Sequence, residues 1–172
     1  MAVKLGIKVA HVEAGLRSFD RTMPEEINRV VTDSISDLLF VSEPSGVENL
    51  RKEGVANDRI HFVGNVMGDT LLQNRARADR SNVLTTLELR PRKYAVVTLH
   101  RPSNVDSADV FDSILSALER ITDDMPVVFP VHPRTQKNLQ ALGFSKRIAG
   151  NQALRLIDPL GYLDFLKLMS DA

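Results

Sequence analysis

Short apolar runs alternate with helix-like segments along almost the whole chain, and this alternation constrains the fold more than any other feature. Six runs are typical of buried strands in a parallel sheet: residues 6–10, 38–41, 60–63, 94–99, 127–131 and 154–157. Between them, the sequence predicts helices over residues 24–37, 42–53, 106–121, 135–142 and 162–169. Strands that alternate with helices indicate an α/β fold whose parallel sheets are covered on both faces.

A long polar segment divides this pattern into two parts. We therefore predict a first unit over residues 1–66, a connecting helical segment over 67–90, and a second unit over 91–172. The chain begins almost directly on a strand and stops after a helix. Two incomplete parallel sheets would expose apolar edges and faces. We therefore expect the chain to be a piece of a larger two-domain protein.

The composition excludes several classes of function. The 22 basic and 22 acidic side chains balance, so the broad positive surface that nucleic-acid binding requires is not expected. The absence of cysteine excludes disulfides and thiolate metal sites. No apolar run approaches the roughly 18–20 residues of a membrane span, and no signal pattern opens the chain. A soluble, cytoplasmic protein without a membrane partner is the expectation.

Three predicted loops share a composition that suits phosphate. They follow the carboxyl ends of predicted strands, where parallel sheets usually bind ligands, and cover residues 11–21, 100–104 and 132–134. Each loop begins with a histidine, respectively His11, His100 and His132, and each contains an arginine. Histidine and arginine both bind phosphate oxygens at neutral pH.

The carboxylates of the first loop and the following helix have structural interpretations as well as catalytic ones. Glu25 stands three residues after Thr22, which is the spacing of a capping box, and this is the favoured interpretation of Glu25. Alternatively, Glu25 pairs with Arg29 at i,i+4, with Glu26 and Arg29 otherwise in solvent.

Glu13 is less easily explained by local structure. It follows an apolar strand, so we expect it at a partly buried strand end, where an unpaired carboxylate is costly. An ion pair with Arg17 is as plausible as a catalytic role. His61, between Ile60 and Phe62, is interpreted as a packed or edge histidine.

The sequence has no motif for a metal or a nucleotide cofactor. HExxH and similar clusters are absent, as are GxGxxG and Walker loops. We therefore expect no metal and no bound cofactor.

Five motifs, taken together, resemble a known family. HVEAGLRSFD, MPEEINR, GN at 64–65, TLHRPSNVD and FPVHPRT occur in the order found in non-hydrolysing UDP-N-acetylglucosamine 2-epimerases. The resemblance implies a GT-B-like fold of two Rossmann-like halves, with a UDP-sugar in the cleft between them. This chain resembles the later part of the first half and the early part of the second, both incomplete. The family's HGD and DSGG-x-QEE segments have no counterpart here.

The resemblance also implies a reaction. The C2 proton is removed, UDP is eliminated, and UDP adds back to the glycal to give UDP-N-acetylmannosamine. Glu13 and Glu25 match the catalytic carboxylates, and His100 matches the histidine near the diphosphate. No cofactor is implied.

Substrate-binding roles follow from the same resemblance. Arg101 is expected to contact phosphate, and Arg17 to bind in the site and orient Glu13. His132 aligns with a loop linked to a second, activating UDP-sugar. A homodimer is implied for the full-length protein.

Other functions stay open at this stage. A hydrolysing epimerase would release free N-acetylmannosamine and UDP, and a related epimerase would act on a diacetamido-uronate sugar nucleotide. The 172 residues alone could be a non-catalytic UDP-sugar-binding piece, and we expect negligible turnover from them.

Overall fold

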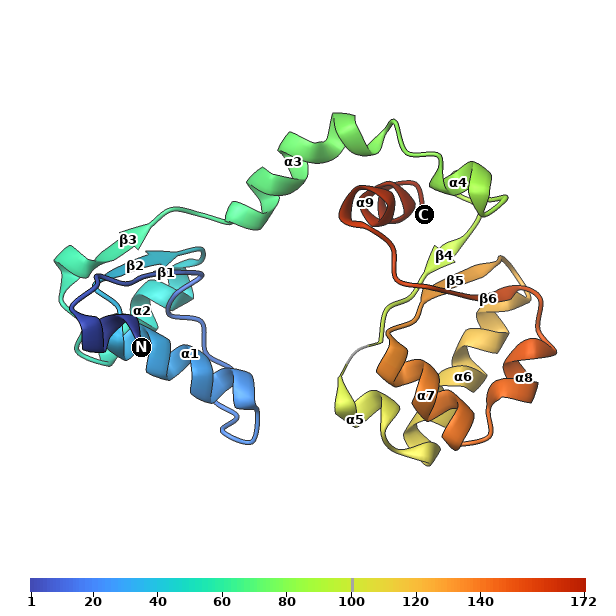
Figure 1. Ribbon diagram of the computed structural model, residues 1–172, viewed down its shortest axis with the longest axis horizontal. Coiled ribbons are helices and arrows are strands. Elements are labelled where there is room, and N and C mark those ends of the chain that lie inside the picture. Colours follow the sequence, from blue (N-terminus) through green and yellow to red (C-terminus); the bar gives the residue numbers. More distant parts are fainter. Residues whose placement is uncertain (100) are drawn as a thin grey trace. The chain divides into compact units, whose positions relative to one another are not determined.

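The computed structural model describes residues 1–99 and 101–172, which form two compact units, Met1–Leu72 and Gln73–Ala172 (Figure 1). The boundary between them falls inside helix α3 (Val66–Ala78), within the polar segment that the sequence predicts as a connection. Each unit contains a three-stranded, all-parallel sheet, so the predicted α/β class is confirmed. No helix in the described part of the chain is long and apolar enough to cross a membrane.

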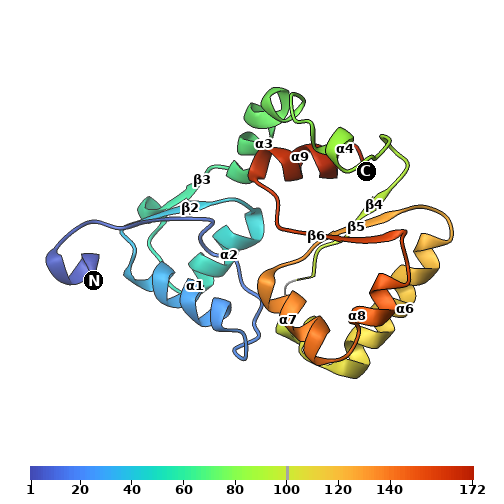
Figure 2. The ribbon, with the colours of Figure 1, turned by 45° about the vertical axis from the view of Figure 1, so that its right-hand side comes forward.

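The first unit is built on one sheet with the strand order β1-β2-β3. Its elements are η1 (Ala2–Leu5), β1 (Ala10–Val12), α1 (Pro24–Ile35), β2 (Leu38–Val41), α2 (Pro44–Lys52), η2 (Asn57–Arg59) and β3 (Ile60–Phe62). Helices α1 and α2 lie on the same side of the sheet in both views (Figures 1 and 2). On the opposite face, Val12 and Leu38 stay exposed. Helices of this unit therefore cover one face of the sheet, and the exposed apolar side chains on the other face agree with the predicted incomplete sheet.

Strand β1 begins four residues later than predicted. Residues 2–5 form the short η1 helix, which ends at Gly6 with a left-handed backbone. Strand pairing starts where the backbone of Val9 bonds to Asp37, immediately before β2. Strand β2 begins only after α1 has ended, so it does not reach as far as residues 6–8. These residues therefore have no neighbouring strand to pair with. As a result, His11 lies inside β1 instead of after it.

Helix α1 starts where predicted, but it packs its polar face inward, which is the reverse of an ordinary amphipathic helix. An apolar stripe normally packs inward. In α1, the two buried side chains are Glu26 and Asp33. The apolar side chains are instead partly exposed, at 39–51%: Ile27, Val30, Val31 and Ile35. The inner face of α1 is therefore a polar surface, and it faces a polar loop.

The second unit is covered by helices on both faces of its sheet, as predicted. Its elements are α4 (Val83–Thr86), β4 (Ala95–Val96), α5 (Pro102–Val105), α6 (Ala108–Thr122), β5 (Val127–Pro130), α7 (Pro133–Ala141), α8 (Ser145–Ala149), β6 (Leu154–Ile157) and α9 (Tyr162–Ser170). The strand order is β4-β5-β6. Helices α6, α7 and α8 lie on one side of the sheet, and α4 and α9 lie on the other (Figure 2).

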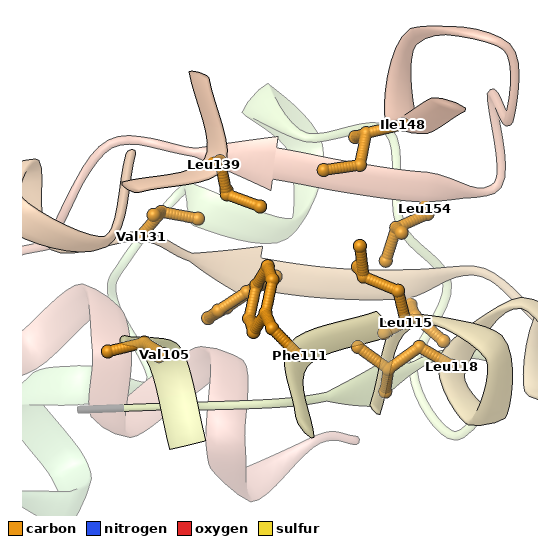
Figure 3. Packing of buried hydrophobic residues seen from close by; sticks show 10 residues of the cluster. Val105, Phe111, Leu115, Leu118, Val131, Leu139, Ile148 and Leu154 are labelled. Atoms are coloured by element: carbon orange, nitrogen blue, oxygen red, sulfur yellow. The ribbon is translucent and has the colours of Figure 1, made fainter. Parts of the chain in front are cut away.

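Two apolar clusters fill these layers. The larger one includes Phe129 of β5 and the side chains of Phe111 and Leu115 of α6, which Figure 3 labels. The smaller one packs Leu168 of α9 and Tyr94 against Val128.

The second unit departs from the predictions in three places. Strand β4 is only two residues long, although the pairing with β5 continues through the bond from Val97 N–H to the Val128 carbonyl. Part of the predicted loop over 100–104 belongs to the short helix α5, and helix α8 was not predicted.

Candidate functional site

The loop between β1 and α1 is held by a buried carboxylate, Asp33. Its Oδ1 lies 2.6 Å from Nδ1 of His11, and its Oδ2 accepts the backbone N–H of Gly15 at 3.0 Å. Oδ2 also lies 2.7 Å from Nη1 of Arg17. The Asp33 side chain is 2% exposed, so these contacts replace the water that a carboxylate otherwise needs.

A second buried carboxylate, Glu26, holds the same loop two helical turns away. Its oxygens accept the backbone N–H groups of Ser18 and Phe19, each at 3.0 Å, and the Ser18 hydroxyl. The Ser18 N–H, followed by these other donors and by Arg29, holds the pKa of the Glu26 carboxyl below its ordinary value. Glu26 is thus a structural acid, and the interpretation of Glu26 as a solvated residue is wrong.

The turn at Gly15 is also fixed by close packing. Gly15 has a φ of +81°, and a Cβ there would lie 2.4 Å from the carbonyl oxygen of Gly46 in α2. The Gly15 carbonyl accepts Nδ2 of Asn49 at 3.0 Å. Only glycine fits this position, because any side chain would meet the backbone of α2.

Glu13 and Glu25 differ from these buried acids. Both side chains are exposed, and neither carboxylate has a hydrogen-bond or ion-pair partner among the described residues. Glu13 also has a left-handed backbone, with a φ of 67°. Such a conformation is disfavoured for a residue with a side chain and is often found at functional sites.

The capping box predicted for Glu25 is wrong. The Thr22 hydroxyl and N–H both donate to Oδ1 of Asp20, and Met23 is the N-cap without a side-chain bond. Arg29 forms its ion pair with Glu26 at 3.4 Å and only bonds the backbone carbonyl of Glu25. The local structural roles considered for Glu25 are therefore absent.

Arg17 does not pair with Glu13, so that expectation is wrong. Its guanidinium side chain is 2% exposed and binds Glu53 through two bonds of 2.6 and 2.8 Å, in addition to Asp33. Glu53, and after it Asp33, raises the pKa of Arg17 above its ordinary value. A charge so well satisfied holds the loop to α2, and a role in substrate binding stays a prediction.

The predicted phosphate-binding residues of the second unit follow neighbouring parallel strands. Arg101 lies beyond β4, and His132 lies between β5 and α7. Both side chains are exposed. His100 lies outside the described residues. The side chain of Asn138 bonds the Val105 carbonyl and Asp106, which ties α7 to the end of α5.

His61 is an edge-strand residue, as interpreted from the sequence. It lies in β3, and its ring is 5.5 Å from that of Phe40. Among the described residues, no group of three or more potential metal ligands gathers in one place.

Sequence reasoning missed Asp33 and Glu53 and misjudged Glu26. A signal was present for two of them, because Glu26 and Asp33 are seven residues apart and therefore lie on one face of α1. Glu53 carries no such signal, since it reaches Arg17 from the end of α2.

Comparison with known proteins identifies the lineage of this site. A model of the UDP-N-acetylglucosamine 2-epimerase family matches residues 1–172. The chain belongs to this family.

Individual relatives agree with the family match. UDP-N-acetylglucosamine 2-epimerase of Methanococcus maripaludis is 40% identical over 99% of this chain and 48% of its own length. UDP-2,3-diacetamido-2,3-dideoxy-D-glucuronate 2-epimerase of Pseudomonas aeruginosa is 39% identical over 98% of this chain and 46% of its own length. The chain thus spans about half the length of the curated relatives that it matches.

A solved structure confirms the fold. The UDP-GlcNAc 2-epimerase of Methanocaldococcus jannaschii, in complex with UDP-GlcNAc and UDP, superposes with a TM-score of 0.89. It is 42% identical, and the match covers 99% of this chain and 48% of that one. The GT-B-like architecture predicted from the resemblance is therefore confirmed.

Proposed function

We propose that the full-length protein interconverts UDP-N-acetylglucosamine and UDP-N-acetylmannosamine by epimerisation at C2. Membership of the family supports this activity. The proposal includes a cytoplasmic, homodimeric enzyme that needs no cofactor.

The observation that carries the proposal is the contrast between two kinds of carboxylate around one loop. Asp33 and Glu26 are buried and have their oxygens occupied by donors from the loop. Glu13 and Glu25 lie within and just beyond the same loop, and their exposed carboxylates have no partner in the described part of the chain. An acid or base must be free to reach the proton that it transfers. Two free carboxylates presented by a fixed loop meet this requirement.

The chemistry assigned to these carboxylates balances without an added reactant. One carboxylate removes the C2 proton while the C1–O bond to UDP breaks, which gives the glycal and free UDP. A proton is then delivered to C2 from the other face, and a phosphate oxygen of UDP re-forms the bond to C1. After one turnover, the base carries the proton taken from C2 and the acid has lost its own, so both exchange protons with water to return to their starting forms.

Positive groups are needed for the departing diphosphate, because charge develops there as the C1–O bond breaks. We assign this role to His100 and Arg101. Arg17 is assigned an orienting role in the first loop, which its buried position suits. His132 is assigned to binding a second, activating UDP-sugar.

The test is solvent exchange by the full-length protein. In deuterium oxide, UDP-N-acetylglucosamine should exchange its C2 proton for deuterium and traces of glycal should appear. The variants Glu13→Gln and Glu25→Gln should each lower kcat by about 10²–10⁴-fold, the range for a lost general acid or base. Retention of the C2 proton by the unmodified protein would contradict the proposal.

A second substrate is favoured by one specific relative. The Pseudomonas aeruginosa protein, 39% identical, is a 2-epimerase of a diacetamido-glucuronate nucleotide. Competition between the two sugar nucleotides for the same preparation distinguishes them, and release of free N-acetylmannosamine would instead indicate a hydrolysing epimerase.

A further inference from the structure

We propose that Asp33 is a positioning residue that fixes the backbone turn at Glu13 and sets the tautomer of His11. The structural part of this proposal stands on contacts within the first unit. Its kinetic consequence rests on the function proposed above.

The donors that Asp33 receives bracket Glu13 along the chain. His11 is two residues before Glu13, Gly15 is two residues after it, and Arg17 is four residues after it. One oxygen of Asp33 therefore contacts the strand that leads into Glu13, and the other contacts the turn that leads away. Among the described residues, no other side chain makes hydrogen bonds or ion pairs on both sides of Glu13.

This bracket explains how Glu13 keeps a disfavoured backbone. A left-handed φ of 67° persists in a residue with a side chain only where the surroundings determine it. The Glu13 carboxylate makes no contact that could hold it, as shown above. The neighbouring backbone must therefore be held instead. The Ala14 N–H donates to the Phe40 carbonyl of β2, and Asp33 adds the side-chain bond to the Gly15 N–H.

The same carboxylate determines which nitrogen of His11 carries a proton. Oδ1 of Asp33 is an acceptor, so the contact of 2.6 Å requires a hydrogen on Nδ1 of His11. In the neutral ring, Nε2 is then left as an acceptor. The charged and titratable groups in contact with Asp33 are His11 and Arg17, and Arg17 also binds Glu53.

The experiment uses the full-length protein labelled with ¹⁵N at histidine, and the variant Asp33→Asn. In the unmodified protein, the His11 ring should show the Nδ1–H tautomer. The amide of the variant can donate a hydrogen to Nδ1, so the ring should change to the Nε2–H tautomer. We expect kcat to fall by about 10–100-fold, as for other residues that orient a functional group, with KM changed less than about threefold. This split separates positioning from general loosening, which would raise KM as well.

Asp37→Asn is the matched control. Asp37 also bonds a backbone N–H next to β1, that of Val9, but it does not contact the turn at Glu13. Its substitution should leave the His11 tautomer and kcat unchanged. A similar fall in kcat for both variants would overturn the proposal.

The remaining outcomes also support or overturn the proposal. If Asp33→Asn folds and keeps either the wild-type tautomer or the wild-type kcat, the inference is wrong. If it fails to fold, an Nε2–H tautomer in the unmodified protein overturns the proposal and an Nδ1–H tautomer supports it. Absence of epimerisation by the unmodified protein would contradict the proposed function alone, because the tautomer is measured without turnover.

Discussion

The two units of this chain are stabilised in different ways. The second unit buries two apolar clusters, one on each face of its sheet. The first unit buries only Ala14, Leu39, Val41 and Leu50, and it adds buried carboxylates that bind the loop after β1. The apolar stripe of α1 is left partly exposed while its acids face inward. Precise placement of a loop thus depends on polar contacts, whereas the stability of a layered domain depends on apolar burial.

The largest effect on stability is expected in the core of the second unit. Phe111 is 1% exposed at the centre of the larger cluster. The variant Phe111→Ala should lower the free energy of unfolding of this unit by about 3–5 kcal/mol, through lost burial and the cavity left behind. Phe19→Ala, at a side chain that is 79% exposed in the first unit, should change the free energy of unfolding of that unit by less than about 0.5 kcal/mol. Equal losses of unfolding free energy for the two variants, measured by urea unfolding, would show that burial does not determine the size of the effect.

In the first unit, the largest effect is expected where the loop meets α2. Gly15→Ala combines a left-handed backbone with a clash against the Gly46 carbonyl, and it should cost about 2–5 kcal/mol. Gly54→Ala is the matched control, because Gly54 has a similar φ of +83° with nothing within 4 Å of a Cβ. It should cost only about 1–2 kcal/mol. A smaller loss at Gly15 than at Gly54 would rule out the close approach.

An intermediate, pH-dependent effect is expected at Glu26. Its pKa is lowered in the folded chain, so its stabilising contribution is present above the ordinary glutamate pKa of about 4.3 and is lost as the pH falls through the folded value. Glu26→Gln should therefore have a lower urea midpoint than the unmodified protein at pH 7, and this gap should narrow towards pH 3. The adjacent Glu25→Gln should show no gap at either pH. If the difference in urea midpoint between Glu26→Gln and the unmodified protein stayed constant from pH 7 to pH 3, the role of Glu26 as a buried structural acid would be contradicted.

The smallest effect is expected at Tyr94, the one polar anchor within the smaller apolar cluster of the described residues. Its hydroxyl donates to the Leu168 carbonyl at 2.6 Å, so Tyr94→Phe should cost about 0.5–1.5 kcal/mol. Burial, with a further contribution from Asp171, raises the pKa of Tyr94 to about 12. The stabilisation is thus present below the unfolded tyrosine pKa of about 10 and is lost as the pH rises from there to 12. Urea unfolding of the unmodified protein and of Tyr94→Phe at pH 7 and pH 11 checks this, because the difference in stability between them should shrink at pH 11. Tyr162→Phe is the exposed control.

Much of the fold could be predicted from apolar periodicity. The strands at 38–41 and 154–157 and the starts of α1 and α9 follow the pattern closely, because each buries a regular apolar face or carries a clear start signal. Strand β1 could not be placed, since its start depends on where β2 begins. The apolar face of α1 misled for a related reason, because the orientation of the helix depends on backbone donors in the preceding loop, and the apolar pattern of the helix does not reveal these bonds.

The candidate site, too, could be predicted only in part from the sequence. Glu13 and Glu25 were found through motifs, but their freedom from partners required the structure. The network of Asp33, Arg17 and Glu53 joins residues up to 36 positions apart, and no local spacing reveals it. Periodicity describes one element at a time, whereas a buried ion pair is a relation between elements.

The most direct measurement is proton exchange at C2 of UDP-N-acetylglucosamine in deuterium oxide, by the full-length protein and its four carboxylate-to-amide variants. The free carboxylates should carry the chemistry, so Glu13→Gln and Glu25→Gln should lose exchange while keeping the unfolding midpoint. The buried ones should carry the structure, so Glu26→Gln should lower the midpoint, and Asp33→Asn should reduce exchange less than loss of Glu13 does. Full exchange by Glu13→Gln and Glu25→Gln would contradict this division of roles.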